Sequence, residues 1–250
     1  MTSTPVRAAA RGTRIRRQAA FETQTMLRNG EQLLVAFVLP ALAMVGLTVA
    51  RVPDLGSPRI ALIVPGVFAL AVASSAFTSQ AIATAFDRRN GVLRLLGTTP
   101  LGRDGLLGGK VLATGAVLLL QLLALSALGL ALGWRPDAVG LVPAVVSVVL
   151  GAAAFVALAM VVAGRLRAEA VLAVANLLWV LFLGLGLLLP TDKLPDAIGT
   201  LARWLPSGAL GDALRSALAA GEWPLASWLV LAGWAAVGAL VATRIFRWSD

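Results

Sequence analysis

The sequence predicts an all-α polytopic membrane protein with six transmembrane helices. Hydrophobic residues make up 59% of the chain and charged residues only 13%, whereas soluble domains average about 25% charged residues. The mean hydropathy is +0.88. Apolar runs near the roughly 20 residues that a membrane helix needs recur along the chain, with short polar segments between most of them. We therefore expect one transmembrane domain, residues 33–250, preceded by a basic amphipathic arm, residues 1–32.

The arm carries six arginines and two glutamates. On a helical projection Ile15, Ala19 and Met26 share one face, flanked by Ala20 and Leu27, while most arginines point elsewhere. This pattern predicts a basic amphipathic helix at the membrane surface. Because the apolar face is thin, a partly disordered arginine-rich tail is the alternative.

The first apolar run contains Pro40, which removes a backbone donor and is expected to kink the helix. The second run has polar side chains in its later half, and the remaining four are more uniformly apolar. The predicted spans are residues 33–50, 60–86, 111–132, 141–163, 170–189 and 225–246.

Four small polar residues of the second span fall on one arc of the helix, so they face protein or a wet cavity rather than lipid. The sequence supports two interpretations of this arc. It is a candidate substrate path together with a polar residue of the fifth span, or its small side chains permit close helix packing. The residues concerned are Ser74, Ser75, Thr78, Ser79 and Asn176.

The longest outer loop lies between the fifth and sixth spans. Leu210, Leu214 and Leu218 recur there every four residues, with Asp212 and Arg215 on the other side. This pattern predicts an amphipathic helix that lies on the outer leaflet before the last span. Aromatic rings suited to the headgroup boundary surround it, at Trp204, Trp223 and Trp228.

Orientation follows from the distribution of basic residues. With both termini in the cytoplasm, the inner segments hold 15 of the 21 basic residues and the outer loops hold six. This bias is the one that membrane proteins show, so we expect a multi-pass plasma membrane protein with both ends inside. The same bias explains the net charge of +9 through loops beside anionic headgroups, and no nucleic-acid partner is expected.

Several chemistries are disfavoured by composition. The chain has no cysteine and no histidine, so no thiolate chemistry, histidine metal site or histidine proton shuttle is expected. The run GRDGLLGGKV resembles a phosphate-binding loop but lacks the required glycine and the Ser/Thr after the lysine, so we expect no ATP site on this chain. No charged residue lies near the middle of a predicted span, which disfavours an ion-coupled carrier.

Residues 87–110 form the longest charged, glycine-punctuated segment on the predicted inner side. Val92, Leu95 and Leu96 fall on one helical face with Leu93 at its edge, and Arg94 points away. This pattern favours a short helix parallel to the membrane between two spans. An ordinary basic loop on anionic headgroups is the alternative.

The segment DRRNGVLRLLGTTP, residues 87–100, resembles the signature of the permease subunits of the second class of ABC exporters. Gly91, Leu93, Leu96, Thr99 and Pro100 match that signature position by position. The order of elements is also similar, since the family has an amphipathic N-terminal helix, six spans and an outer Leu-rich helix. The run PSGALGDALR, residues 206–215, resembles the one in that outer helix.

This resemblance implies that the segment is a coupling helix received by a groove on a separate ABC ATPase. It implies two ATPase copies, which bind ATP and Mg²⁺, and a second permease chain in a bacterial plasma membrane. The expected cargo is hydrophobic or amphipathic: a drug, a lipid or a lipid-linked glycan. A membrane anchor that recruits a soluble partner without transport is the alternative. The residues expected to serve coupling are Arg88, Arg89, Gly91, Val92, Leu93, Arg94, Leu95, Leu96, Thr99 and Pro100.

The segment departs from the family pattern at three positions. Arg89 and Arg94 stand where the family usually has acidic residues, and Val92 replaces a threonine. Because charge complementarity sets partner choice at such interfaces, we expect a more acidic groove on the ATPase.

Overall fold

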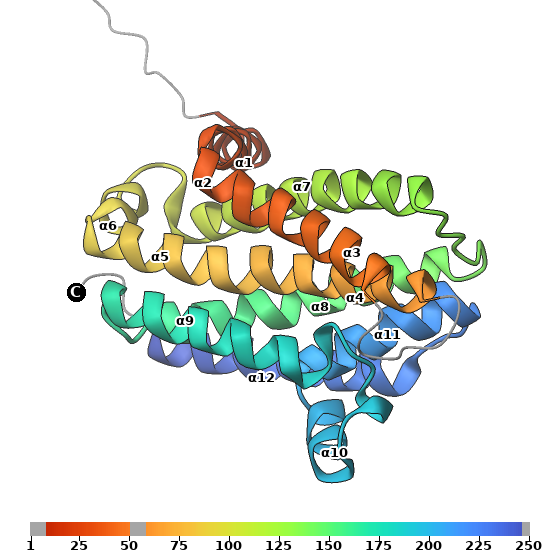
Figure 1. Ribbon diagram of the computed structural model, residues 1–250. Coiled ribbons are helices and arrows are strands. Elements are labelled where there is room, and N and C mark those ends of the chain that lie inside the picture. The colour runs from red at the N-terminus through yellow and green to blue at the C-terminus, as the bar shows by residue number, and fades with distance from the viewer. Residues whose placement is uncertain (1–8, 51–58, 247–250) are drawn as a thin grey trace, which may run out of the picture.

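The computed structural model describes residues 9–50 and 59–246, and every regular element within these ranges is helical, as the sequence predicts. Long helices lie side by side and α1 crosses them near one end (Figure 1). Arg7, Arg51 and Arg247 of the charge count lie outside the described residues. In chain order the elements are α1 (Arg11–Arg28), α2 (Gly30–Leu33), η1 (Leu34–Val38), α3 (Leu39–Val49), α4 (Ile60–Ala73), η2 (Ser74–Ser79), α5 (Gln80–Arg89), α6 (Val92–Gly97), α7 (Gly102–Ala131), α8 (Leu141–Ala163), α9 (Ala168–Phe182), η3 (Leu183–Leu187), η4 (Thr191–Lys193), α10 (Asp196–Trp204), α11 (Pro206–Ala220) and α12 (Leu225–Ile245).

Five helices in the described part of the chain are long and apolar enough to cross a membrane, and they overlap the predicted second to sixth spans. The predicted first span, residues 33–50, corresponds to a shorter apolar helix, Ala36–Val49. At about 1.5 Å per residue it reaches about 21 Å, less than the roughly 30 Å of a hydrocarbon core. The count of six spans is therefore not confirmed. The five helices are Ile60–Arg89, Asp104–Ala131, Leu141–Ala163, Ala168–Leu187 and Leu225–Ile245.

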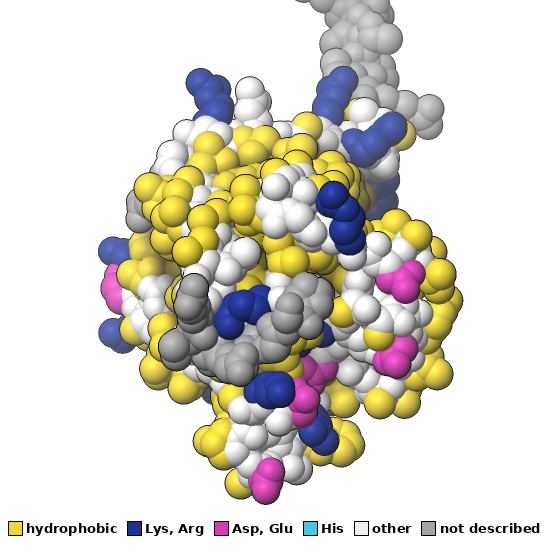
Figure 2. Space-filling model, turned by 45° about the vertical axis from the view of Figure 1, so that its right-hand side comes forward, with side chains coloured by type: hydrophobic (Ala, Val, Ile, Leu, Met, Phe, Trp, Pro, Cys, Tyr) yellow, Lys and Arg dark blue, Asp and Glu magenta, His cyan; other side chains and the backbone are white. Residues whose placement is uncertain are grey.

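The continuous helix formed by α4, η2 and α5 is the axis of the bundle. Its most apolar stretch is 83% buried, whereas the corresponding stretches of the other four are at most 33% buried. It packs against α3, α7, α8, α9 and α11 and crosses the middle of Figure 1. Hydrophobic side chains cover much of the flanks of the bundle in Figure 2, as expected where the outer helices face lipid.

The helix distortion expected at Pro40 is present as η1, a π-helical turn directly before α3. Proline has no amide hydrogen, so the carbonyl of Ala36, four residues earlier, loses its ordinary α-helical donor. The buried amide of Gln121 on α7 donates a hydrogen bond to that carbonyl. The Gln121 Oε1 atom accepts one from Ser75 at 2.8 Å. One glutamine therefore joins the Pro40 helix to the axis of the bundle.

At the opposite end from α6, the helix begun by α9 breaks within η3. Leu185 leaves helical geometry and Gly186 adopts a φ of 97°, which frees carbonyls near the end of the helix. Arg215 of α11 donates to the carbonyls of Gly186 at 2.6 Å and Leu187 at 3.0 Å, and to Asp212 at 3.0 Å. Burial lowers the pKa of Arg215 below its ordinary value, and Asp212 opposes that shift.

This geometry corrects the sequence interpretation of the outer helix. Leu210, Leu214 and Leu218 are buried inside the bundle instead of facing the outer leaflet, and Arg215 on the supposed polar side is only 5% exposed. The reason is that α11 packs against α4, α8, α12 and η3, so the bundle covers more than one of its faces. The helix that stands out from the bundle is α10, where Leu201 is 58% and Trp204 is 68% exposed (Figure 1).

Replacing Arg215 with methionine is expected to destabilise the protein by about 3 kcal/mol, because buried carbonyls and Asp212 lose their donor. Thermal unfolding in detergent would measure the change. Lys193→Met, an exposed cation in the same outer region, is the matched control and is expected to leave the melting temperature unchanged. Equal melting temperatures for the two variants would contradict the capping role of Arg215.

Candidate functional site

The charged segment singled out by the sequence connects α5 to α7 at one end of the bundle (Figure 1). Gly91, with φ 72°, ends α5 and allows α6 to begin at Val92. The hydroxyl groups of Thr98 and Thr99 donate to the carbonyls of Leu95 and Leu96 at 2.8 and 2.6 Å and close the far end of α6. Gly102, with φ 70°, then starts α7. The predicted short helix is thus a compact turn between two long helices.

The face of α6 that points into the bundle differs from the expected one. Leu93, placed at the edge of the apolar face by the helical projection, is 1% exposed, whereas Leu95 is 68% exposed. Because α6 packs against α5 and α7, Leu93 fills the space beneath it. Val92 and Leu96 are half-buried, and Arg94 is exposed beside Leu95. The outward surface of α6 is therefore formed by Arg94 and Leu95.

Arg88, at the end of α5, points inward. Its side chain is 4% exposed, and its guanidinium donates to the carbonyl of Ala163 at 2.6 Å and to that of Leu166. Ala163 is the last residue of α8 and Leu166 lies in the turn just beyond it. A cation is favourable there because the last carbonyls of a helix lack intrahelical donors. Arg88 therefore fixes α5 to α8 from within the protein.

Arg89 and Arg94, the two basic residues that depart from the family pattern, lie in different surroundings. Arg89 forms an ion pair with Glu169 at the start of α9, and its guanidinium lies 5.9 Å from the centre of the Phe86 ring. Arg94 forms no ion pair or side-chain hydrogen bond with any residue that the structure describes. Of these two arginines, Arg94 is therefore the one whose side chain remains available to a partner.

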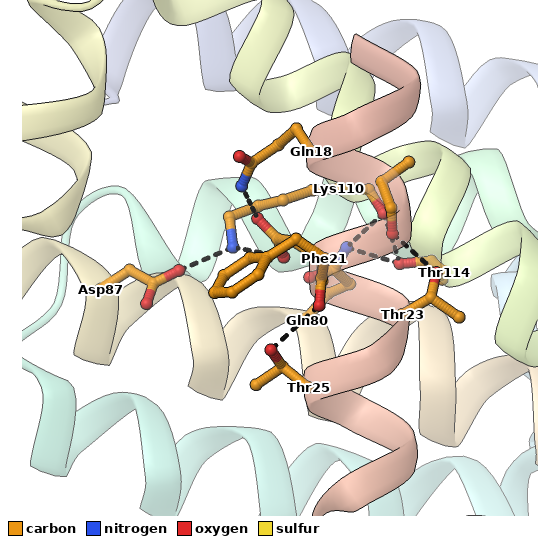
Figure 3. A network of polar contacts seen from close by, with 10 residues as sticks. Gln18, Phe21, Thr23, Thr25, Gln80, Asp87, Lys110 and Thr114 are labelled. Atoms are coloured by element: carbon orange, nitrogen blue, oxygen red, sulfur yellow. Dashed lines mark hydrogen bonds and ion pairs between the residues drawn. The ribbon is translucent and has the colours of Figure 1, made fainter. Parts of the chain in front are cut away.

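A buried lysine joins the helices on either side of α6. Lys110 on α7 is 4% exposed, and its ammonium lies 2.6 Å from Asp87 of α5 and 3.1 Å from Glu22 of α1. Gln18 donates to the other Glu22 oxygen at 3.0 Å. Figure 3 shows the ammonium pointing toward Asp87, with the Gln18 side chain nearby. One cation thus holds three helices together.

The next turn of α7 extends this network into the bundle. The Gln80 side-chain amide donates to the Thr114 hydroxyl at 2.6 Å and to the Lys110 carbonyl at 3.3 Å (Figure 3). Gln80 is 1% exposed. The sequence interpretation assigned no role to Lys110 or Gln80. The signal that could have pointed to Lys110 is Glu22, the one glutamate of the arginine-rich helix α1, because a buried cation needs a partner of opposite charge.

Three glycines of α7 lie beneath α1. A Cβ atom at Gly109 would lie 2.7 Å from Gln18 Cγ, and one at Gly108 would lie 3.5 Å from Ile15. Gly105 also faces Ile15, at 3.7 Å. The Gly105 and Gly109 pair matches the G-x-x-x-G pattern, which allows close helix packing. The apolar face of α1 therefore packs on α7, with Ala19 buried, instead of resting only on lipid.

The polar arc of the axis helix makes hydrogen bonds to neighbouring helices. Ser74 accepts one from the Trp179 indole at 2.7 Å, and Ser75 donates to Gln121 at 2.8 Å. Thr78 and Ser79 are half-buried, and the cavity beside Ser75 and Ser79 has a volume of about 10 Å³, room for one water molecule. Asn176 is exposed on α9 and does not join them. A substrate path along this arc stays a prediction.

Fold and site together define a multi-pass helical membrane protein with a short helix presented at one end by two internally anchored spans. A family model described as ABC-2 family transporter protein matches residues 56–244. Because the match covers most of the chain, the protein belongs to the ABC-2 transporter family and is an ABC-2 type permease, which confirms the resemblance found in residues 87–100. A comparison with curated proteins finds no match.

Replacing Lys110 with methionine is expected to destabilise the protein by about 2 kcal/mol and to loosen α1, because Glu22 and Asp87 lose their shared cation. Hydrogen exchange of residues 11–28 should accelerate. Arg11→Met removes the exposed pair with Asp104, whose atoms lie 3.7 Å apart, and should have little effect. Unchanged exchange in the Lys110 variant would show that α1 is held by packing alone.

Replacing Gly109 with valine is expected to displace α1, because the new side chain would collide with the base of Gln18. The chain has no cysteine, so Ala19→Cys provides a single reporter thiol. Maleimide labelling of that thiol should rise several-fold with Gly109→Val. It should not rise with Gly115→Val, because a Cβ at Gly115 meets nothing within 4 Å. Equal labelling in both backgrounds would rule out the close α1–α7 contact.

Proposed function

We propose that this permease moves a hydrophobic or amphipathic substrate, such as a drug, a lipid or a lipid-linked glycan, and is driven by a separate ABC ATPase. The observation that carries the proposal is the outward pair Arg94 and Leu95 on α6. An exposed leucine beside an unpaired cation is the chemistry expected of a surface that enters an acidic groove.

Coupling would pass from α6 into the bundle through its flanking helices. The helix α5 is continuous with the axis Ile60–Arg89, and Lys110 ties α7 and α1 to it. Arg88 and Leu93 support α6 from inside, so we assign them a supporting role and leave the contact with the ATPase to Arg94 and Leu95. ATP and Mg²⁺ would be bound by the partner chain.

The proposed assembly has two ATPase chains and a second permease, the same or homologous, in a bacterial plasma membrane. Both termini face the cytoplasm, and α6 lies on that side with α1. The shorter helix Ala36–Val49 serves as the first of six spans, lengthened by α2 and the first residues of η1. These assignments rest on the family and on the distribution of basic residues.

A membrane anchor without transport activity is the second candidate. It is favoured by the hydrogen bonds of Ser74 and Ser75 to Trp179 and Gln121, since a polar arc used in packing gives no argument for a cargo path. ATP-dependent uptake of an amphipathic dye by liposomes that contain both subunits would support the permease, and its absence with an assembled, hydrolysing complex would support the anchor.

The double substitution Arg94→Glu and Leu95→Ser is expected to weaken ATPase binding at least tenfold, because burying a leucine contributes about 1.5–3 kcal/mol and the charge is reversed. Co-purification with the candidate ATPase and permease-stimulated hydrolysis measure the effect. The thermal stability of the permease should not change, because both side chains are exposed.

The control is Arg165→Glu, an exposed arginine in the turn between α8 and α9. It carries the same change of charge but lies outside α6, so assembly should persist. Assembly and stimulated hydrolysis that survive the double substitution would overturn the coupling role of α6.

A further inference from the structure

A groove lies between α1 and α7. Its volume is about 520 Å³. Leu112 and Ala116 form the α7 wall, and Leu27 adds an apolar side chain from α1. Gln24 and Arg28 of α1 line the same groove and supply polar atoms. The groove is therefore amphipathic, with its polar groups on α1.

The groove follows from the way the two helices cross. Glycines 108 and 109 bring α1 close to α7, and because α1 runs across the bundle while α7 runs along it, the helices then diverge (Figure 1). On α7 the wall continues as an exposed apolar stripe, since Leu112, Leu119 and Leu123 share one helical face and are 51%, 60% and 58% exposed. An extended hydrocarbon chain fits along such a stripe.

The charge of α1 favours an anion at the polar side. The helix carries five arginines and one glutamate, and that glutamate, Glu22, is already bound to Lys110. Arg28 is exposed and forms no ion pair or side-chain hydrogen bond with a described residue. Gln24 is exposed one turn earlier. Together they offer a guanidinium and an amide, which suit phosphate oxygens.

We propose that this groove binds an anionic phospholipid of the cytoplasmic leaflet. The phosphate contacts Arg28 and Gln24, and one acyl chain lies along Leu112 and the stripe beyond it. A free phosphate would leave the apolar wall uncovered, so the lipid is the occupant that matches both halves of the groove. This lipid site is additional to the proposed transport function. It depends on that function only for the placement of α1 on the cytoplasmic side of the membrane.

The test uses the full chain in nanodiscs that contain phosphatidylglycerol and phosphatidylcholine, followed by stepwise delipidation and native mass spectrometry. The wild type should retain phosphatidylglycerol in preference to phosphatidylcholine. Arg28→Gln should weaken retention about fivefold, because one arginine near an anionic surface contributes about 1 kcal/mol. Arg28→Lys should restore most of it.

Arg16→Gln is the matched control, since Arg16 is exposed on the same helix but does not line the groove. Leu112→Gln tests the tail and should lower retention without changing the charge. Equal losses in the Arg16 and Arg28 variants, or equal retention of the two lipids by the wild type, would overturn the proposal in favour of diffuse attraction. Displacement by glycerol phosphate alone would overturn the requirement for the acyl chain. None of these readouts involves the ATPase, so they are independent of the coupling experiment.

Discussion

The bundle depends on the burial of the helix Ile60–Arg89. Because this helix has little surface toward lipid, its polar groups gain from partners inside the protein, where an unpaired group is costly. Ser74 and Ser75 have such partners, whereas the Thr78 and Thr84 hydroxyls have no hydrogen-bond partner among the described residues. Small residues on this helix allow the neighbouring helices to approach it closely. A Cβ atom at Gly66, for example, would lie 3.0 Å from the carbonyls of Leu187 and Leu188. The neighbouring helices therefore approach closely enough for their side chains to bind the axis, as the Trp179 indole does at Ser74 and the Gln121 amide does at Ser75.

Buried cations hold the two ends of this packing. Arg88 binds the last carbonyl of α8 and one in the turn beyond it, and Arg215 binds the carbonyls freed where the helix of α9 breaks. Both use guanidinium groups, whose several donors suit a set of carbonyl oxygens. Lys110 instead lies between two carboxylates from different helices, where a compact ammonium can approach both. The chemistry of each cation thus matches the acceptors that its end of the bundle provides.

The sequence predicted the all-helical class, and five of its predicted spans overlap the five long helices. Continuous apolar runs are enough to locate helices of this kind. The sequence also favoured α6, because Val92, Leu95 and Leu96 fall on one helical face, with an ordinary basic loop as the alternative. It did not predict that Arg215 and Leu93 are buried. A helical projection gives the faces of one helix but not how many neighbours cover it, and α11 is covered on more than one face. Gly105 and Gly109 contact α1 in the structure. In a sequence with 25 glycines, however, G-x-x-x-G matches are expected by chance, so this pair did not predict the contact.

The same contacts determine how a force on α6 would travel. Arg88 and Lys110 fix α5, α7, α8 and α1 to one another near α6, so a displacement there cannot be absorbed locally without breaking buried charge contacts. Deeper in the bundle, at the π-helical turns η1 and η2, the regular hydrogen-bond pattern is already interrupted. Gln121 connects these two turns through the Ala36 carbonyl and Ser75. A displacement of α6 that reached these turns would therefore bend the axis helix and the Pro40 helix together, because the Gln121 side chain is hydrogen-bonded to both.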